Sequence, residues 1–540
     1  MRIQELRYHF WIILLFLIIQ PANCQHHLER LQKIDVQHYS YSISLSDTSD
    51  VIYSSTGINL IFKEPFKFFS LDLANKDDSG KGMTVKRVTV NGKVSRFSHR
   101  NDSLYIYYEC TNANTSATVN IEYSGIPADG LIISENKFGN RTFFGDNWPD
   151  RAHNWLACID HPSDKATVEF KISVPDHYKV IATGNLIYEK SPGNHYKIYH
   201  WQSDEPMPTK VMVIGVAEFA IDTIENNLNI PVSTWVYPEN SDEWFEGFST
   251  VTEPVLFYAN YIAPYPFSKL ANVQSTTIFG GMENAGNIFY RESFMTGDRW
   301  QEGTIAHEIA HQWFGNSVSE GNWHHVWLSE GFATYMTDLF YEHKYGQDAF
   351  KSRMERERNM VIRYAKRKYS PVIDNTITDY MDLLNLNSYE KGAWFLHMLR
   401  KNLGDELFRE CIRKFYEKYK YSNALTGDFK DVIESVSGKS MGNFFEQWLC
   451  KAGHPVLNIT WYQKKKNVFI KIEQQQKGTI FDFPLDLGFV SKDGSMKTKT
   501  FHCNKIAEDY SVPVAGKIEN LVPDPDTWLL FEGNLTRKRF

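Results

Sequence analysis

The chain has 540 residues, a formal net charge of −7, a hydrophobic content of 42% and an aromatic content of 15%. This length exceeds what one hydrophobic core usually serves, so about three domains are expected. The charge is modest and spread along the chain without a basic stripe suited to phosphate contacts, which excludes nucleic acid as an expected partner.

The N-terminal segment resembles an export signal. Two arginines precede the apolar run WIILLFLIIQ, which is too short to cross a bilayer comfortably, and Ala22 and Cys24 provide small residues before a cut at Gln25. Residues 1–24 are therefore predicted to be a signal peptide, and the protein is predicted to be secreted or periplasmic. An uncleaved membrane anchor is the alternative, and membrane attachment is expected only through this segment.

Three regions follow, and together they predict an α+β multidomain protein. Residues 25–238 contain alternating runs such as YSISLS, and Asn91-Gly92 is a strong hairpin signal, so a large β-rich N-terminal domain is expected. From 239 to 455 the apolar spacing is helical apart from one glycine-rich strand region, which predicts a mainly helical domain. Residues 456–540 return to short strands suited to a small β-sandwich.

Two further features bear on this organisation. The charge-rich stretch RMERERNM at 353–360 is interpreted as a solvated helix face. The cysteines after residue 24 have no C-x-x-C spacing, so they form no disulfide scaffold, and buried free thiols are the simpler interpretation. One pair in an oxidising compartment is the alternative. These cysteines are Cys110, Cys158, Cys411, Cys450 and Cys503.

The sequence HEIAH at 307–311 has the spacing of a metal-binding helix. Residues i and i+4 share one face of an α-helix, so His307 and His311 can direct ring nitrogens at one cation, with Glu308 beside them as a base. Glu330 in WLSEGFATY completes a His₂Glu set, which leaves a fourth position open at catalytic zinc sites. One zinc ion per chain is therefore expected. A core helix whose histidines have other partners is the alternative.

An expected substrate-binding edge lies upstream of this motif. Residues 275–279 (STTIF) are β-branched and aromatic, which predicts a strand, and a glycine-rich segment follows. Adjacent glycines allow another backbone to approach, so an extended peptide is expected to pair here by strand addition, with its free α-ammonium at Glu283. A glycine turn with a solvated glutamate is the alternative. The candidate substrate-binding residues are Gly280, Gly281, Met282, Glu283 and Asn284.

Three motifs carry a family resemblance. GGMENAG, HEIAHQWFGN and VWLSEGFATY, in this order and spacing, resemble those of the zinc aminopeptidases related to aminopeptidase N and leukotriene-A hydrolase, which are gluzincin metallopeptidases. The resemblance implies a thermolysin-like catalytic domain and a transition-state-stabilising role for Tyr389 in SYEKGAW. Without the resemblance, this tyrosine is an ordinary packed helix residue. The other implied roles are a general base at Glu308, zinc ligands at His307, His311 and Glu330, and an amine-binding carboxylate at Glu283.

Two features depart from the family pattern. Relatives add a Gln or Glu from the N-terminal domain to the amine site, but FFGDNWPDRAHNW at 143–155 offers neither, and Asp146 is the candidate substitute. Larger relatives carry a further helical domain over the cleft, whereas this chain stops after the predicted sandwich, as a short form would. An open cleft that tolerates longer peptides is therefore expected.

The sequence thus predicts a zinc-dependent aminopeptidase that hydrolyses the N-terminal bond of peptides with a free N-terminus. An epoxide hydrolase of the leukotriene type is one alternative, because it shares the GGMEN form. A catalytically silent peptide-binding homologue is the other, and it would be expected to have lost one or more of the five residues His307, Glu308, His311, Glu330 and Tyr389. All five are present.

Overall fold

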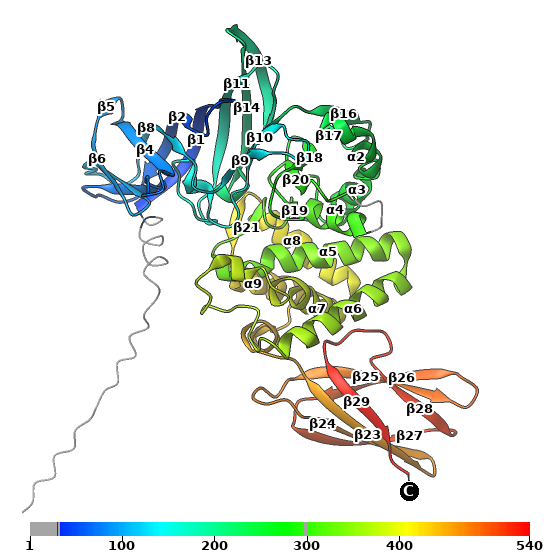
Figure 1. Ribbon diagram of the computed structural model, residues 1–540. Coiled ribbons are helices and arrows are strands. Elements are labelled where there is room, and N and C mark those ends of the chain that lie inside the picture. The colour runs from blue at the N-terminus through cyan, green and yellow to red at the C-terminus, as the bar shows by residue number, and fades with distance from the viewer. Residues whose placement is uncertain (1–29, 31–32, 296–299, 540) are drawn as a thin grey trace, which may run out of the picture.

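The computed structural model describes residue 30 and residues 33–295 and 300–539. The predicted signal peptide at 1–24 lies outside these residues. A β-rich N-terminal part, a helical middle part and a β-sheet C-terminal part follow one another from the top to the bottom of Figure 1. None of the helices in the described part of the chain is both long and apolar enough to cross a membrane.

The N-terminal part contains an eight-stranded sheet and two smaller ones. Its strands are β1 (Ile34–Ser44), β2 (Ile52–Phe62), β3 (Phe69–Asp72), β4 (Gly82–Val90), β5 (Lys93–Val94), β6 (Arg96–Arg100), β7 (Ser103–Tyr107), β8 (Thr115–Ile126), β9 (Leu131–Glu135), β10 (Arg141–Gly145), β11 (Ala166–Pro175), β12 (Lys179–Ala182), β13 (Asn185–Gly193), β14 (Tyr196–Met207) and β15 (Ile214–Ala217). The large sheet has the order β13-β14-β11-β1-β2-β8-β4-β5, and the smaller sheets are β12-β15-β10-β9 and β3-β7-β6.

The local patterns of this part agree with the sequence. Strand β1 alternates buried and more exposed residues along most of its length, as expected for a strand with one face in the core. The predicted hairpin joins β4 to β5. Its turn residues Asn91 and Gly92 have φ angles of 50° and 75°, because a tight two-residue turn of this kind needs positive φ at both positions.

A five-stranded sheet connects the N-terminal part to the helices. Its order is β16-β17-β18-β20-β19, with β16 (Ala220–Ile224), β17 (Val232–Val236), β18 (Leu270–Ser275), β19 (Gly281–Met282) and β20 (Asn287–Arg291). Strands β17 and β18 pair in parallel, so both segments belong to one unit. The predicted boundary at residue 238 lies between β17 and β18, so this sheet contains segments from both sides of it. The sheets of the N-terminal part end with β15.

The predicted strand at 275–279 is also wrong. Strand β18 ends at Ser275, and residues 276–280 form no strand. The β-branched and aromatic side chains of this stretch are used in a bend before β19, where tertiary contacts override the local preference.

The helical part surrounds one long buried helix. Its elements are α2 (Ser241–Gly247), α3 (Thr252–Tyr261), α4 (Trp300–Ala310), α5 (Trp327–Tyr345), α6 (Gln347–Ala365), a π-helical turn η6 (Asn387–Lys391), α7 (Gly392–Leu403), α8 (Asp405–Tyr419), α9 (Thr426–Ser437) and α10 (Gly442–Phe445), with a small parallel pair of β21 (Val318–Glu320) and β22 (Ser422–Ala424). Helix α5 is buried from Trp327 to Phe340, so it forms the centre of this part.

The C-terminal part consists of two sheets that form a sandwich (Figure 1). One sheet contains β23 (Val456–Lys464), β24 (Asn467–Gln474), β27 (Ala507–Pro513) and β29 (Glu532–Arg537), and the other contains β25 (Phe483–Ser491), β26 (Met496–Cys503) and β28 (Ile518–Pro523). Buried side chains of both sheets, including Trp461 and Leu487, join one continuous core with the helices. The sandwich is therefore packed against the helical part.

The cysteines of the described residues are all free thiols. Four of them, Cys110, Cys158, Cys411 and Cys503, are buried, and Cys450 is exposed. The four buried cysteines agree with the simpler interpretation of the sequence, and the exposed Cys450 does not.

Candidate metal centre and substrate-binding edge

The structure brings the three predicted metal ligands together between α4 and α5. His307 Nε2 lies 3.0 Å from His311 Nε2, and Glu330 Oε2 lies 3.4 Å and 3.2 Å from these two nitrogens. His311 follows the last residue of α4, but its amide still donates to His307 O at 3.2 Å. The two rings therefore stay one helical turn apart on the same face.

The arrangement of these atoms fits a tetrahedral divalent cation. Zinc bonds of about 2.0–2.1 Å to nitrogen and oxygen place neighbouring ligand atoms about 3.3 Å apart, which agrees with the three separations of 3.0 to 3.4 Å. His311 Nδ1 lies 3.1 Å from Phe314 O and 3.0 Å from Ser329 Oγ. A proton on Nδ1 then donates to the carbonyl, and Nε2 keeps its lone pair for the cation. The three side chains can therefore hold zinc.

Glu308 lies beside this triad on α4. Its carboxylate forms a group with Glu283 and His311 in which the ligand-type atoms lie within 4.8 Å of one another. Burial raises the pKa of Glu308; His311 opposes this shift, whereas the charges of Glu283 and Glu330 add to it. A Cβ at Gly281 would lie 2.5 Å from Glu308 Oε1. Glycine at this position therefore leaves the space that the carboxylate occupies.

Strand β19 lies at the end of the five-stranded sheet, paired with β20 on one side. A strand end of this kind can accept an extended peptide through main-chain hydrogen bonds. Gln312 Nε2 and Asn316 Nδ2 donate to Glu283 O at 3.0 Å and 2.5 Å, so the segment after the histidine motif fixes the backbone at Glu283. The contacts of Gln312 and Asn316 were not predicted, although both residues belong to the motif HEIAHQWFGN.

The burial and hydrogen bonding of the Glu283 side chain would favour a cationic ligand. It is 5% exposed, and its Oε1 atom has no hydrogen-bond partner among the described residues. A buried acceptor without a donor costs free energy, which a bound ammonium group would recover.

Asp146 does not supply a second amine-binding carboxylate. Its Oδ1 accepts a hydrogen bond from Arg151 Nη2 at 2.9 Å, and its Oδ2 accepts from Thr277 Oγ1 at 3.1 Å and from Ile278 N at 3.2 Å. Both oxygens are therefore engaged. The predicted role is wrong because Asp146 links the N-terminal part to the bend before Gly280, a pairing that residue type and chain position do not reveal.

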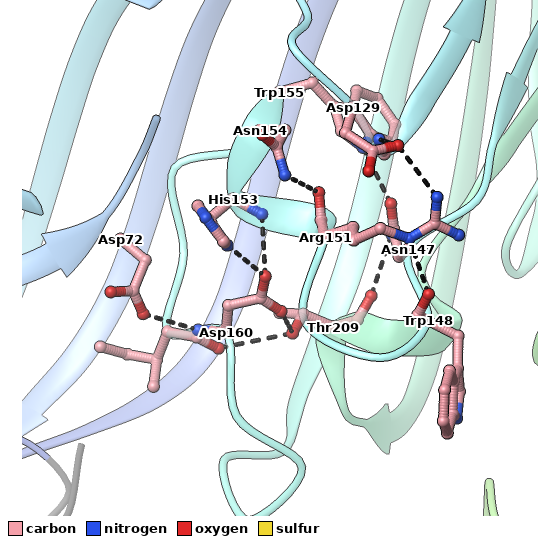
Figure 2. Close-up of polar contacts among 12 residues, drawn as sticks. Asp72, Asp129, Asn147, Trp148, Arg151, His153, Asn154, Trp155, Asp160 and Thr209 are labelled. Atoms are coloured by element: carbon pink, nitrogen blue, oxygen red, sulfur yellow. Dashed lines mark hydrogen bonds and ion pairs between the residues drawn. The ribbon is translucent and has the colours of Figure 1, made fainter. Parts of the chain in front are cut away.

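Trp148, two residues further on, forms part of the cavity wall instead. Figure 2 shows that its backbone belongs to a polar network, in which Arg151 Nε donates to Trp148 O at 2.8 Å and Trp155 Nε1 donates to Asn147 Oδ1 at 2.9 Å. The Trp148 side chain points away from this network. It lines the cavity beside Phe279, with ring centroids 6.2 Å apart. The N-terminal part therefore contributes an aromatic side chain where a carboxylate was expected.

Tyr389 reaches the metal ligands from the π-helical turn η6, a feature that often marks functional sites. Its ring stacks on His307 with centroids 5.9 Å apart and an interplanar angle of 12°. Burial raises the pKa of Tyr389, and the charges of Glu330, Glu283 and Glu308 raise it further. The phenol therefore keeps its proton and can act as a hydrogen-bond donor.

These side chains line one cavity of about 690 Å³. It extends from Trp148 and Phe279, past the metal ligands, to helix α6. There Arg353, Arg356 and Glu357 contribute to its wall. The stretch RMERERNM is therefore only in part a solvated face: Glu357 is 3% exposed, and its contact with the cavity was not predicted.

Comparison with known proteins agrees with this geometry. Protein-family models match the chain twice, with the peptidase family M1 domain at residues 248–448 and the peptidase M1 N-terminal domain at residues 37–211. Aminopeptidase M1-C of Oryza sativa subsp. japonica is 29% identical over 365 residues, covering 63% of this chain and 41% of that protein. Tricorn protease-interacting factor F2 of Thermoplasma acidophilum is 28% identical over 414 residues, covering 73% of this chain and 51% of that protein.

The fold also resembles a solved structure. The crystal structure of Legionella pneumophila aminopeptidase A in complex with aspartic acid superimposes with a TM-score of 0.81 at 18% identity, covering 93% of this chain and 60% of that chain. This chain spans about half the length of the curated relatives that it matches. Since both family models match in chain order around the metal centre and the N-terminal sheets, the chain belongs to peptidase family M1.

Proposed function

We propose that this chain is a zinc-dependent aminopeptidase that hydrolyses the N-terminal peptide bond of peptides. The observation that carries the proposal is the placement of Glu283. Its buried carboxylate, whose Oε1 atom has no hydrogen-bond partner in the part of the chain that the structure describes, lies beside the open edge strand and within 4.8 Å of Glu308 and His311. A carboxylate there binds a free α-ammonium and limits cleavage to the first peptide bond, because a blocked N-terminus has no charge to offer.

The substrate is expected to extend along β19. The backbone of the peptide pairs with the free edge of β19. The α-ammonium of the peptide lies at Glu283, and its first carbonyl lies between Glu308 and Tyr389. This order of groups is supported by the position of Glu283, which directly follows β19 in the chain and groups with Glu308 and His311.

The chain's own residues then carry the proton transfers. Glu308 takes a proton from the attacking water and passes it to the leaving amine, while the protonated Tyr389 hydroxyl donates a hydrogen bond to the developing oxyanion. Zinc, when bound by His307, His311 and Glu330, supplies Lewis-acid polarisation of the carbonyl. Glu283 keeps the amine in place and takes no part in the proton transfer.

The test compares leucine p-nitroanilide with its N-acetylated form on the purified full chain. We expect hydrolysis of the free-amine substrate, loss of activity with 1,10-phenanthroline, recovery with zinc, and resistance of the acetylated substrate. Equal hydrolysis of both substrates would indicate an endopeptidase. Turnover of an epoxide without turnover of any peptide would favour the leukotriene-type alternative, and no turnover of either would favour the silent homologue.

A variant pair makes the test specific to the amine site. Glu283→Gln removes the charge that binds the ammonium, so we expect KM for the anilide to rise about tenfold or more. Glu410→Gln is the matched control, because Glu410 is exposed on α8 and outside the cavity. Equal KM values for Glu283→Gln and the control would contradict the assigned role of Glu283.

A further inference from the structure

The cavity continues beyond the metal ligands, on the side opposite to Glu283. Glu283 groups with Glu308 and His311, at the C-terminal end of α4. Gly303 and Thr304 also line the cavity, and they lie one helical turn before His307. The cavity therefore has an amine end at Glu283 and a distal end at the start of α4, and the distal end faces the leaving part of a peptide.

The two ends differ in chemistry. Trp148, Phe279, Met282 and Leu384 give the amine end an apolar wall. The distal end is lined by threonine hydroxyls of α4 and α5 and by a group of charged side chains, which we term the distal cluster: Arg353, Arg356, Glu357 and Glu390. A side chain that enters the distal end therefore meets polar and charged groups.

Gly303 adds a little room to the wall of the distal end. A Cβ at this position would lie 3.4 Å from Tyr341 Oη and 3.8 Å from Arg353 Nη1, which is ordinary contact distance, so the glycine leaves room for about one methyl group beside these two side chains. Glycine in a helix interior costs about 1 kcal/mol relative to alanine. The cavity gains depth toward the distal cluster at that cost.

Carboxyl groups outnumber buried cations at the distal cluster. Arg353 Nε donates to Asp338 Oδ1 at 2.7 Å, and its Nη2 atom lies 3.8 Å from Glu357 Oε1. Arg353 is therefore already paired. Arg356 is exposed on α6, where water screens its charge.

The two glutamates of the distal cluster differ in their partners. Glu357 is 3% exposed and shares a hydrogen bond with the Asp338 side chain, whereas the Oε2 atom of Glu390 has no hydrogen-bond partner among the described residues. Burial raises the pKa of both side chains, to about 7 for Glu390, and the charge of Asp338 adds to each shift. The charges of Arg353 and Arg356 oppose the shift at Glu357, and that of Arg356 opposes the shift at Glu390. A cationic ligand would act in the same direction and stabilise the ionised form of both side chains.

We propose that the distal cluster binds the side chain of the second residue of the peptide and selects lysine or arginine there. The side chain enters the distal end beside Thr304, and its ammonium or guanidinium group binds the carboxyl group of Glu357 and the Oε2 atom of Glu390, which has no partner among the described residues. Acidic side chains are rejected by the same carboxylates. This specificity rests on the proposed aminopeptidase function, since it assumes that Glu283 fixes the N-terminus.

The test is a panel of tetrapeptide amides with a free N-terminus that differ only at the second residue: Leu-Lys-Ala-Ala, Leu-Leu-Ala-Ala and Leu-Glu-Ala-Ala. We expect kcat/KM for the lysine peptide to exceed that for the glutamate peptide about tenfold or more, the size of one charge-assisted hydrogen bond. Equal values, or a preference for glutamate, would overturn the proposal while leaving the aminopeptidase function intact. Failure to cleave any peptide would instead refute the aminopeptidase function, and the specificity with it.

Variants with opposite expected effects assign the selectivity to the distal cluster. Glu390→Gln removes one carboxylate and should lower the lysine-to-glutamate ratio severalfold. Arg356→Gln removes the exposed competing cation and should raise this ratio. Glu410→Gln, which removes an exposed charge outside the cavity, should leave the ratio unchanged. Equal ratios in all three variants would show that the selectivity arises elsewhere, even if the wild-type protein prefers lysine.

Discussion

Gly331 and Gly392 are in backbone contact beside the metal ligands: a Cβ on Gly331 would lie 2.9 Å from the Cα of Gly392, and a Cβ on Gly392 would lie 3.0 Å from the Cα of Gly331. Gly331 directly follows the ligand Glu330, and Gly392 lies three residues after Tyr389. This contact therefore fixes how closely Tyr389 approaches the ligands.

Gly331→Ala should disturb both stability and catalysis. The added methyl group has backbone atoms as its nearest neighbours and cannot be accommodated by a side-chain rotation, so we expect a loss of about 1–3 kcal/mol in the free energy of unfolding, together with a lower kcat as Tyr389 moves away. Urea unfolding and anilide turnover measure the two effects. Gly427→Ala in α9 is the control, because a Cβ there meets nothing within 4 Å. Equal unfolding midpoints for the two variants would contradict the close contact.

Glu308→Gln should separate catalysis from metal binding. The amide cannot take a proton from water, so kcat should fall by about 10²–10³ or more. The ligands His307, His311 and Glu330 are unchanged, so one zinc per chain should remain when metal content is measured by mass spectrometry. Near-normal turnover would show that another group is the base, and loss of zinc would show that Glu308 belongs to the ligand set.

Tyr389→Phe should act on the transition state alone. The substitution keeps the ring that stacks on His307 and removes only the hydroxyl. We expect kcat to fall about 10²–10³-fold with little change in KM, because the lost hydrogen bond forms with the oxyanion and not with the ground state. A rise in KM at constant kcat would assign the hydroxyl to substrate binding.

The stability of the N-terminal part should depend on pH through His153. Its Nδ1 lies 2.8 Å from Asp160 Oδ2 (Figure 2). Burial would lower the pKa of His153, but the hydrogen bond and charge of Asp160, together with Asp72 and Asp150, raise it to about 9. Because the folded pKa exceeds the unfolded value of about 6.5, this stabilisation is complete below about pH 6.5 and is lost as the pH rises to about 9.

A thermal unfolding series from pH 6 to 9.5 tests this linkage. His153→Gln should lower Tm at pH 6, where the pair contributes up to about 3 kcal/mol, and its Tm should approach that of the wild type at pH 9.5. His195→Asn is the control, since the His195 side chain is 94% exposed. A Tm difference between His153→Gln and the wild type that stays constant over this range would refute the charge pairing.

The grouping of His307, His311 and Glu330 could be predicted because its geometry is local. His307 and His311 are one helical turn apart whatever surrounds them, and Glu330 required only that a second helix pack against the first. Tyr389 depended on the family resemblance, since no local pattern in SYEKGAW distinguishes it from a packed residue. Strand alternation and the Asn91-Gly92 turn were predictable for the same local reason.

What could not be predicted depends on distant partners. The five-stranded sheet that spans residue 238 depends on the pairing of β17 with β18, across an intervening pair of helices. The role of Asp146 is decided by Thr277 and Ile278, more than a hundred residues away. Glu357 appeared solvated because its neighbours in sequence are charged, yet helix packing turns this position inward together with Met354.

The hydrogen bonds of Asp146 also have a consequence for the construction of fragments and chimeric proteins. One of its oxygens binds Arg151 in the N-terminal part, and the other binds the bend that carries Gly280. A fragment that starts at β16 would keep every metal ligand but would present the substrate edge without this support. The two parts are therefore coupled through Asp146, and we expect a chimera that exchanges the N-terminal part to need an aspartate and an arginine at the matching positions of the new N-terminal part.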